Sequence, residues 1–190
     1  MSGVYVHPQG LCDSEDVGDG TRVWAFAHVL AGARVGRDCN ICGGAFIEAG
    51  AVLGDNVTVK NGTLVFAGVT CSDDVFLGPN VLFTNDLRPR AHVKREAGAL
   101  LPTFVARGAT LGAGTIVVCG THIGEYAFTA AGSVVTRDVP PYALVVGNPA
   151  VRKGWVCVCG ERLGADLRCP GCAAAYQLVS EGRGLRPVQP

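Results

Sequence analysis

The sequence is poor in charged and aromatic side chains, and neither sign of charge is in excess. Charged residues make up 17% and aromatic residues 7% of the chain, and 16 Lys and Arg balance 16 Asp and Glu. A general binder of nucleic acid or of an anionic membrane surface carries a basic excess, so we expect neither partner. The 48% content of apolar residues also excludes a wholly disordered chain.

Long hydrophobic runs are also missing. No apolar segment approaches the roughly 20 residues that a membrane-spanning helix needs, and the first residues lack the basic and then apolar pattern of a secretory signal. We therefore expect a cytoplasmic protein. In a reducing compartment the nine cysteines indicate buried small side chains, metal ligands or catalytic thiols rather than disulfides.

Glycine is abundant, with 27 residues, and the sequence has a period of six. Val, Ile or Leu occupies 16 of the 19 positions that recur every sixth residue through 11–83 and again through 105–135, and a small or β-branched residue such as Thr21 or Ala45 follows four positions later in most hexads. Helical geometry would scatter such positions around the axis. Three hexads instead make one coil of short strands, and coils stack as parallel strands about 4.8 Å apart. The sequence therefore predicts an all-β fold, a parallel β-helix of hexapeptide repeats.

The repeat stops after Phe83 and resumes at Val105, which predicts an extruded loop at about 89–104. A solenoid has no packing reason to expel such a segment, and long loops are often functional. The loop and its base are basic and suit phosphate groups, although a solvated charged loop explains the composition equally well. These basic residues are Arg88, Arg90, His92, Lys94 and Arg95.

Repeats such as Val17–Arg22 and Leu53–Thr58 resemble those of the hexapeptide-repeat acyltransferases. Four further segments resemble a subgroup of that family that acetylates nucleotide-linked amino sugars, namely the UDP-2-acetamido-3-amino-2,3-dideoxyglucuronate and dTDP-3-amino-sugar N-acetyltransferases. These segments are Val23–Val29, which carries Trp24, Phe26 and His28, and then Val59–Asn61, Phe83–Asn85 and Tyr142–Ala150. The resemblance covers roughly residues 5 to 155. It implies a left-handed β-helix, a homotrimer with active sites between subunits, and acetyl-CoA as the co-substrate.

The resemblance also implies an acceptor site. Asn85 is the first candidate for holding the acceptor amine beside the thioester, and His28 and His92 are candidate general bases. Each histidine also has a simpler interpretation: His28 fills a polar notch near a coil corner, and His92 is a solvated loop residue. The candidate substrate-binding residues are Trp24, Lys60, Asn61, Asp86, Arg88 and Arg90.

Coenzyme A is expected along the later coils, where small residues let a ligand approach the backbone closely. Glycine and alanine at these places are equally explained as residues of coil corners. The candidates are Ala131, Gly132, Gly147 and Pro149, with Arg152 and Lys153 placed to meet phosphates.

Two close cysteine pairs follow this domain of residues 1–155. Cys157 and Cys159 form the first pair and Cys169 and Cys172 the second, and four thiolates are a closed, structural ligand set for Zn²⁺. The first pair has one intervening residue where two is commoner. We expect a small zinc-ribbon-like knuckle over 156–180 and a disordered tail over 181–190.

Three functions remain open at this point. The leading hypothesis is an acetyl-CoA-dependent N-acetyltransferase acting on the 3-amino group of a UDP- or dTDP-linked sugar. An O-acetyltransferase acting on a sugar, serine or antibiotic hydroxyl would need a dedicated histidine base, because a hydroxyl is a poor nucleophile. A non-catalytic solenoid that recruits partners is the third. A zinc hydratase of the same fold is disfavoured, because His28, His92 and His122 lack the required clustering.

Overall fold

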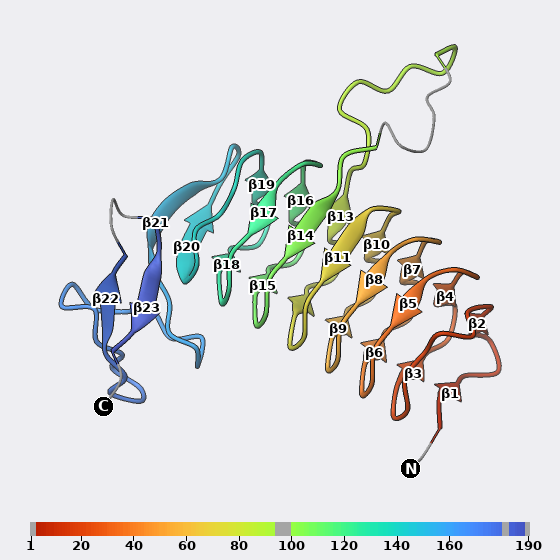
Figure 1. Ribbon diagram of the computed structural model, residues 1–190, viewed down its shortest axis with the longest axis horizontal. Coiled ribbons are helices and arrows are strands. Elements are labelled where there is room, and N and C mark those ends of the chain that lie inside the picture. Colours follow the sequence, from red (N-terminus) through yellow and green to blue (C-terminus); the bar gives the residue numbers. More distant parts are fainter. Residues whose placement is uncertain (1–2, 94–99, 180–182, 189–190) are drawn as a thin grey trace.

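A computed structural model describes residues 3–93, 100–179 and 183–188 of the 190-residue chain. In these ranges the regular secondary structure consists of short strands, most of them two residues long, and none of it is a helix that could cross a membrane. The strands stack coil upon coil into one elongated solenoid (Figure 1). The all-β parallel solenoid predicted from the period of six is confirmed, and its arrangement fits a left-handed β-helix.

The solenoid has three faces, each a parallel sheet. Sheet A contains β1 (Tyr5–Val6), β3 (Arg22–Val23), β6 (Asn40–Ile41), β9 (Thr58–Val59), β12 (Phe76–Leu77), β15 (Thr110–Leu111), β18 (Phe128–Thr129) and β20 (Ala143–Val146), with β21 (Val151–Trp155) added antiparallel. Sheet B contains β2 (Leu11–Cys12), β4 (His28–Val29), β7 (Phe46–Ile47), β10 (Leu64–Val65), β13 (Leu82–Phe83), β16 (Ile116–Val117) and β19 (Val134–Val135). Sheet C contains β5 (Arg34–Val35), β8 (Val52–Leu53), β11 (Val69–Cys71), β14 (Thr103–Val105) and β17 (His122–Ile123).

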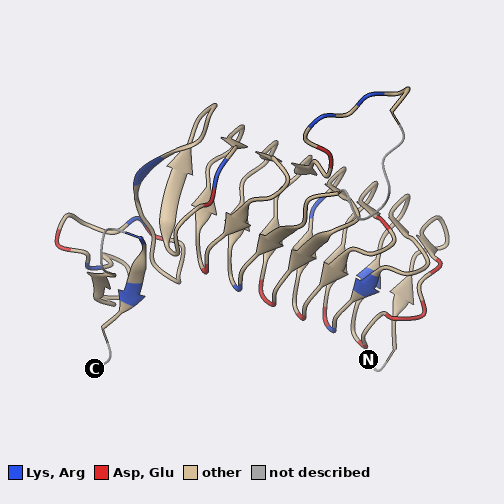
Figure 2. Cartoon of the chain, turned by 45° about the horizontal axis from the view of Figure 1, so that its top comes forward, with Lys and Arg blue, Asp and Glu red and all other residues tan. Residues whose placement is uncertain are grey.

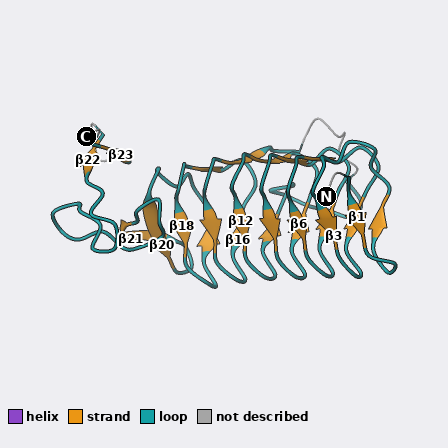
Figure 3. Ribbon diagram, turned by 90° about the horizontal axis from the view of Figure 1, so that it is seen from below, coloured by secondary structure: helices purple, strands orange, loops and turns teal. Residues whose placement is uncertain are grey.

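The register shows that one coil is 18 residues long. Asn40 pairs with Thr58, and Thr58 pairs with Phe76, each 18 positions on. Phe76 then pairs with Thr110, 34 positions on, so the chain inserts 16 residues without shifting the stack. Figure 3 shows the coils of sheet A continuing in line through this point.

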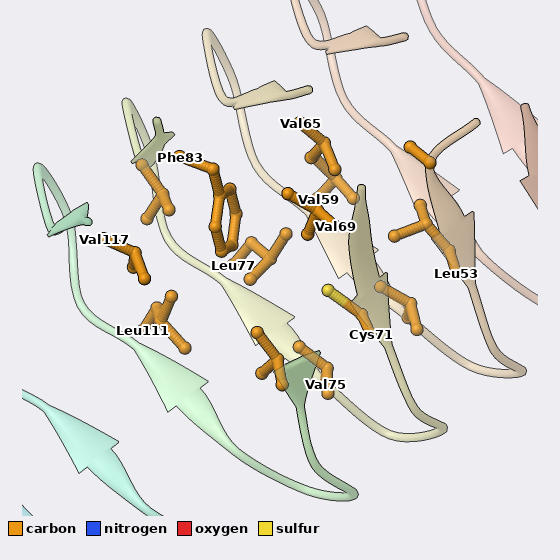
Figure 4. Close-up of a cluster of buried hydrophobic side chains, with 14 of the residues drawn as sticks. Leu53, Val59, Val65, Val69, Cys71, Val75, Leu77, Phe83, Leu111 and Val117 are labelled. Atoms are coloured by element: carbon orange, nitrogen blue, oxygen red, sulfur yellow. The ribbon is translucent and has the colours of Figure 1, made fainter. Parts of the chain in front are cut away.

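The core is a narrow column of the aliphatic residues that lead each hexad. Successive inward side chains from β9, β12 and β15 on sheet A are Val59, Leu77 and Leu111, and all are fully buried. Val65, Phe83 and Val117 of sheet B meet them from the adjacent face (Figure 4). Each inward side chain packs against the coils above and below, which is what the repeat of aliphatic residues provides.

Between β13 and β14 the chain leaves the stack and projects from it (Figure 1). Leu87–Val93 of this projection are exposed, and Figure 2 shows basic residues along it. The neck is closed where the Leu101 N–H donates to the Asn85 carbonyl at 3.1 Å. Lys94 and Arg95, which the sequence assigns to the basic loop, lie outside the described residues.

At the C-terminal end, β21 leads into the cysteine-containing segment, which ends in the antiparallel pair of β22 (Tyr176–Leu178) and β23 (Leu185–Pro187). The expectation of a disordered tail over 181–190 is wrong for β23. Leu185 is buried in a small core with Tyr142, Leu163 and Tyr176, and its N–H donates to the Pro141 carbonyl. Two aliphatic residues, Leu185 and Val188, in a tail rich in glycine and proline were too weak a signal for this packing.

Candidate acetyltransfer site between two edges of one sheet

Sheet B has an apolar outer face. Outward positions alternate with the buried ones along each strand, and on sheet B they are partly exposed aliphatic or aromatic residues in nearly every coil. They are Phe46, Leu64, Leu82, Ile116 and Val134, with His28 near the N-terminal end. The outer face of sheet A includes instead Arg22, Asn40 and Thr58, and that of sheet C includes Arg34 and Thr70. Only sheet B therefore presents a continuous apolar surface among the described residues.

Two edges border this face. We call the turns that lead from sheet A to sheet B the A/B edge; they comprise residues 24–26, 42–44, 60–62, 78–80, 112–114 and 130–132, and the β20–β21 turn at 147–150 follows them at the end of the stack. We call the turns that lead from sheet B to sheet C the B/C edge; they comprise residues 31–32, 49–50, 67–68, 85–86, 119–120 and 137–138. Backbone hydrogen bonds stack the turns of the A/B edge, such as Asn80 N–H to the Asn61 carbonyl at 2.9 Å.

Trp24, Lys60 and Asn61 lie on the A/B edge. The Trp24 indole N–H donates to Asn40 Oδ1 at 2.6 Å, and the Tyr5 ring stands edge-on at 5.6 Å. The Asn61 amide covers the preceding turn so closely that a Cβ on Gly43 would come within 3.3 Å of its nitrogen. Burial raises the pKa of the Cys42 thiol, and the charge of Lys60 opposes that rise. Lys60 therefore supplies positive charge to this edge.

The candidate coenzyme A residues lie farther along the same edge. The Gly132 N–H donates to the Ala113 carbonyl, which places Ala131 and Gly132 one coil beyond residues 112–114. A Cβ added to Gly114 or Gly132 would meet nothing within 4 Å, so the backbone there is open to a ligand. Gly147 and Pro149 follow in the turn that ends the edge.

Arg152 and Lys153 continue this surface on β21. The Arg152 guanidinium lies 4.3 Å from the centroid of the Trp155 ring, and the Lys153 carbonyl accepts a hydrogen bond from Arg162 at 2.9 Å. Arg152 also lines a cavity of about 380 Å³ together with Arg137 and Ala150. The sequence analysis did not single out Arg137, although it is the only basic residue among the described positions of the B/C edge.

Asn85 and Asp86 lie on the B/C edge, at the base of the projecting loop. The adjacent Thr84 hydroxyl accepts from the Cys119 N–H at 3.0 Å, which ties this turn to the next coil. Asp86 Oδ1 accepts from the Arg88 N–H at 2.7 Å. Arg90 is exposed on the loop that leaves the stack at this edge.

The predicted site residues of one chain are thus divided between the two edges of sheet B. Trp24, Lys60 and Asn61 are separated from Asn85 by the width of the sheet, and no single chain brings the two groups together. Sequence reasoning did not anticipate this division within the chain, although the position of each residue in its hexad determines its edge.

His28 and Asn85 are also at different levels of the solenoid. His28 lies on β4, where its Nε2 is 2.8 Å from Asp13 Oδ2 and its ring meets Phe46 edge-on. Asn85 follows β13, and the sheet order β4–β7–β10–β13 puts three strand spacings, about 14 Å, between the two levels. This separation disfavours the expectation that His28 and Asn85 both act at one reacting atom. His92 is an exposed residue of the loop.

The four predicted metal ligands do come together. The Sγ atoms of Cys157, Cys159, Cys169 and Cys172 all lie within 4.8 Å of one another, with two pairs at 3.5 Å. Burial alone would raise the pKa of the Cys157 thiol, but hydrogen bonds from the Cys159 backbone N–H and the Tyr176 hydroxyl lower it to about 7. At Cys159 the Glu161 backbone N–H lowers the pKa, but the Cys157 and Cys169 thiols raise it to about 12, so one thiol of the cluster is readily ionised while a neighbouring thiol stays protonated.

Comparison with known proteins identifies the family of the chain. Residues 16–49 match the family model described as bacterial transferase hexapeptide (six repeats). The chain is 50% identical over 159 residues to dTDP-3-amino-3,6-dideoxy-alpha-D-galactopyranose 3-N-acetyltransferase of Aneurinibacillus thermoaerophilus, a match that covers 84% of this chain and 82% of the relative.

Among solved structures, a point mutant of GDP-perosamine N-acetyltransferase from Caulobacter crescentus, in complex with CoA and GDP-perosamine, is 26% identical with a TM-score of 0.56. The match covers 81% of this chain and 58% of that enzyme, so the chain spans somewhat more than half of its length. Repeat, fold and relatives agree: the chain belongs to the hexapeptide-repeat acetyltransferases, in the group of nucleotide-sugar N-acetyltransferases.

Proposed function

We propose that this protein transfers the acetyl group of acetyl-CoA to the 3-amino group of a dTDP-linked amino sugar. The observation that carries the proposal is the 50% identity, over 84% of the chain, with an enzyme named for that reaction. The residues of its candidate site are compatible with it. Lys60 and an open backbone track of small residues lie along the A/B edge, and Asn85 and the basic loop residue Arg90 lie on or beside the B/C edge.

The active site is formed between subunits of a homotrimer. Two observations support this: the apolar outer face of sheet B, and the division of the site residues between the two edges of that face. If sheet B faces a three-fold axis parallel to the solenoid, the A/B edge of each chain meets the B/C edge of the next. Lys60 and Asn61 of one subunit then stand opposite Asn85 of its neighbour, and the ring closes with three equivalent sites.

The chemistry at such a site needs few protein groups. The neutral amine attacks the thioester carbonyl carbon, the carbonyl oxygen becomes an oxyanion, and collapse of this intermediate breaks the carbon–sulfur bond. The proton lost by the amine nitrogen goes to the departing thiolate. The Asn85 amide holds the acceptor amine beside the thioester, so orientation supplies much of the rate. Because His28 lies about three strand spacings away, this scheme does not use His28 as a base.

Coenzyme A lies along the C-terminal half of the A/B edge in this proposal. Ala131, Gly132 and Gly147 let the pantetheine arm approach backbone groups, and Pro149 flanks the adenine. Arg152 and Lys153 carry the charge that the phosphates require. The openness of Gly132 to a ligand supports this placement.

We also propose that the four cysteines hold a structural Zn²⁺. Four sulfurs around zinc at about 2.3 Å stand roughly 3.8 Å apart, and the Sγ atoms here all lie within 4.8 Å of one another. Four thiolates leave no open coordination position, so the ion would hold the fold of residues 157–172 and take no part in acetyl transfer. Metal analysis of the purified protein is expected to give one zinc per chain, and a Cys157→Ser, Cys172→Ser variant far less.

A second acceptor class is favoured by one observation. The pair of His28 and Asp13 has the geometry of an oriented imidazole base, which a hydroxyl acceptor would need. The two functions are separated by measuring CoA release with mass detection of the product, using dTDP-, UDP- and GDP-linked amino sugars beside their hydroxyl analogues.

A gain of one acetyl group on a dTDP-linked 3-amino sugar is the expected result. If only the hydroxyl analogues are acetylated, the acceptor is a hydroxyl and not an amine, and the second function replaces the first. Absence of both turnover and acetyl-CoA binding, in trimeric protein loaded with zinc, would refute the proposal and favour a non-catalytic solenoid.

A further inference from the structure

Phe26 occupies a turn position at which other coils carry glycine or asparagine. Its φ is 61°, and the matching turn positions of later coils, with φ between 56° and 72°, are Gly44, Gly62, Asn80, Gly114 and Gly132. This left-handed conformation is unfavourable for a bulky side chain, and it persists in proteins chiefly where the surroundings or the function demand it. A phenylalanine at this turn therefore indicates either a stabilising contact or a functional role.

Packing within the chain does not supply one. Phe26 is 71% exposed, the highest value among the large apolar side chains of the described residues. Tyr126 also sits at a left-handed turn, but it stacks on Tyr142 with ring centroids 5.4 Å apart. The Phe26 ring has no such aromatic partner in the part of the chain that the structure describes. Its open face is available to a molecule from outside the chain.

A second aromatic ring borders the same turn and is held in place. Trp24 is 38% exposed, and its indole orientation is fixed by the hydrogen bond to Asn40 and by the edge of Tyr5. Two aromatic side chains on one turn, one of them fixed, form a surface suited to a flat ring. Nucleobases bind to such surfaces by stacking, and this stacking does not depend on the hydrogen-bond donors and acceptors of the base.

Charge along the edge points to the rest of this ligand. Lys60 is on the A/B edge two coils beyond Phe26, which is about 10 Å along the axis. Between them lies the turn of Gly43 and Gly44. The Asn61 amide covers this turn at Gly43, whereas a Cβ on Gly44 would meet no atom closer than 3.8 Å, so the backbone is open at Gly44. Along the edge, an aromatic surface is followed by open backbone and then by a cation. A nucleoside diphosphate has its base, ribose and diphosphate in the same order.

We propose that Phe26 and Trp24 bind the nucleobase of the nucleotide-linked acceptor, with Lys60 at its diphosphate. The inference deepens the proposed function and rests on it. The acceptor then occupies the N-terminal half of the A/B edge and coenzyme A the C-terminal half, and the two meet at the level of Asn85. Phe26 becomes a determinant of substrate affinity, distant from the reacting atoms.

Phe26→Gly is the decisive variant, because glycine fits the left-handed turn better than phenylalanine and the fold is preserved. Binding of dTDP, UDP and GDP is measured by calorimetry on the full-length trimer. Loss of one stacking contact with a base weakens binding by about 5- to 150-fold. We therefore expect the dissociation constant of dTDP to be higher for Phe26→Gly than for the unaltered protein by a factor in this range. Phe26→Tyr keeps an aromatic face, and Phe104→Ala removes an exposed aromatic ring from sheet C. Both are expected to bind dTDP as the unaltered protein does.

The position of the base is checked by fluorescence. The chain has two tryptophans, and a Trp155→Phe background leaves Trp24 as the only one. Quenching of Trp24 by dTDP, lost in Phe26→Gly, is the expected result. Unchanged dTDP affinity in Phe26→Gly would overturn the proposal. Dissociation of the Phe26→Gly trimer into single chains would also overturn it, because that result would assign Phe26 to the subunit contact. If Phe26→Gly fails in this way while the unaltered protein binds dTDP and acetylates the amino sugar, the proposed function stands and only this inference falls.

Discussion

His28 offers a sharp test of how the solenoid arranges its chemistry. It is oriented by Asp13 at 2.8 Å, so it has the partner that a general base needs. Its level, however, is three strand spacings from that of Asn85, about 14 Å, whereas a general base acts within roughly 3 Å of the proton that it removes. A three-fold arrangement about a parallel axis does not reduce this separation, because symmetry copies keep their levels.

We therefore expect the turnover rate of His28→Ala to stay within about 3-fold of that of the unaltered enzyme, whereas loss of a true general base costs about 10²- to 10⁴-fold. Steady-state rates of CoA thiol release with saturating acceptor measure this turnover rate, and a pH–rate profile serves as the control. The acidic limb of the profile is expected to keep its position in the variant. A turnover rate lowered by about 10²-fold or more, together with loss of that limb, would refute the reasoning and place the reacting atoms beside His28.

The remaining predictions concern the acceptor side chain, the subunit contact and the metal. Asn85→Ala is expected to lower the turnover rate by about 10²- to 10³-fold, as removal of a positioned amide does in other acyl transfers, and an unchanged rate would exclude Asn85 from the site. Leu64→Lys, on the outer face of sheet B, is expected to convert the trimer to single chains in sedimentation analysis, while Thr70→Lys on sheet C leaves it assembled; the opposite pattern would assign the contact to sheet C. Removal of zinc by a chelator is expected to abolish hydrogen-exchange protection of the Leu163 and Cys169 amides and to leave the Val59 and Val117 amides protected, because the coils have their own core. Retained protection of the Leu163 and Cys169 amides would show that the cysteine segment folds without metal.

Much of the fold follows from one feature of the sequence. Side chains that point inward at every sixth residue can all be buried in an 18-residue coil, whereas in a helix they would point in different directions. The period therefore predicted the coils and their inward residues. The same period could have given the levels of His28 and Asn85, since Leu82, the partner of Leu64 on sheet B, is three coils beyond His28. The spacing of the cysteines likewise predicted that four sulfurs could meet.

Other features depended on contacts between residues far apart in the chain. The sequence showed neither that Asp13 orients His28 nor that Leu185 folds back against Pro141, because no local pattern records which surface a side chain will meet. Phe26 carried a signal, its place in register with Gly44 and Gly62, but its exposure is a property of the folded surface.

The sequence by itself determined the solenoid, its coil length and its reactive residue types, because a strict period leaves one way to bury its aliphatic side chains. The tertiary structure alone decided that the insertion keeps the register of the stack and which side chains of different coils meet, as those of Asp13 and His28 do. These properties arise from the stacking of coils, in which the local conformations of successive turns and strands add up over the length of the molecule.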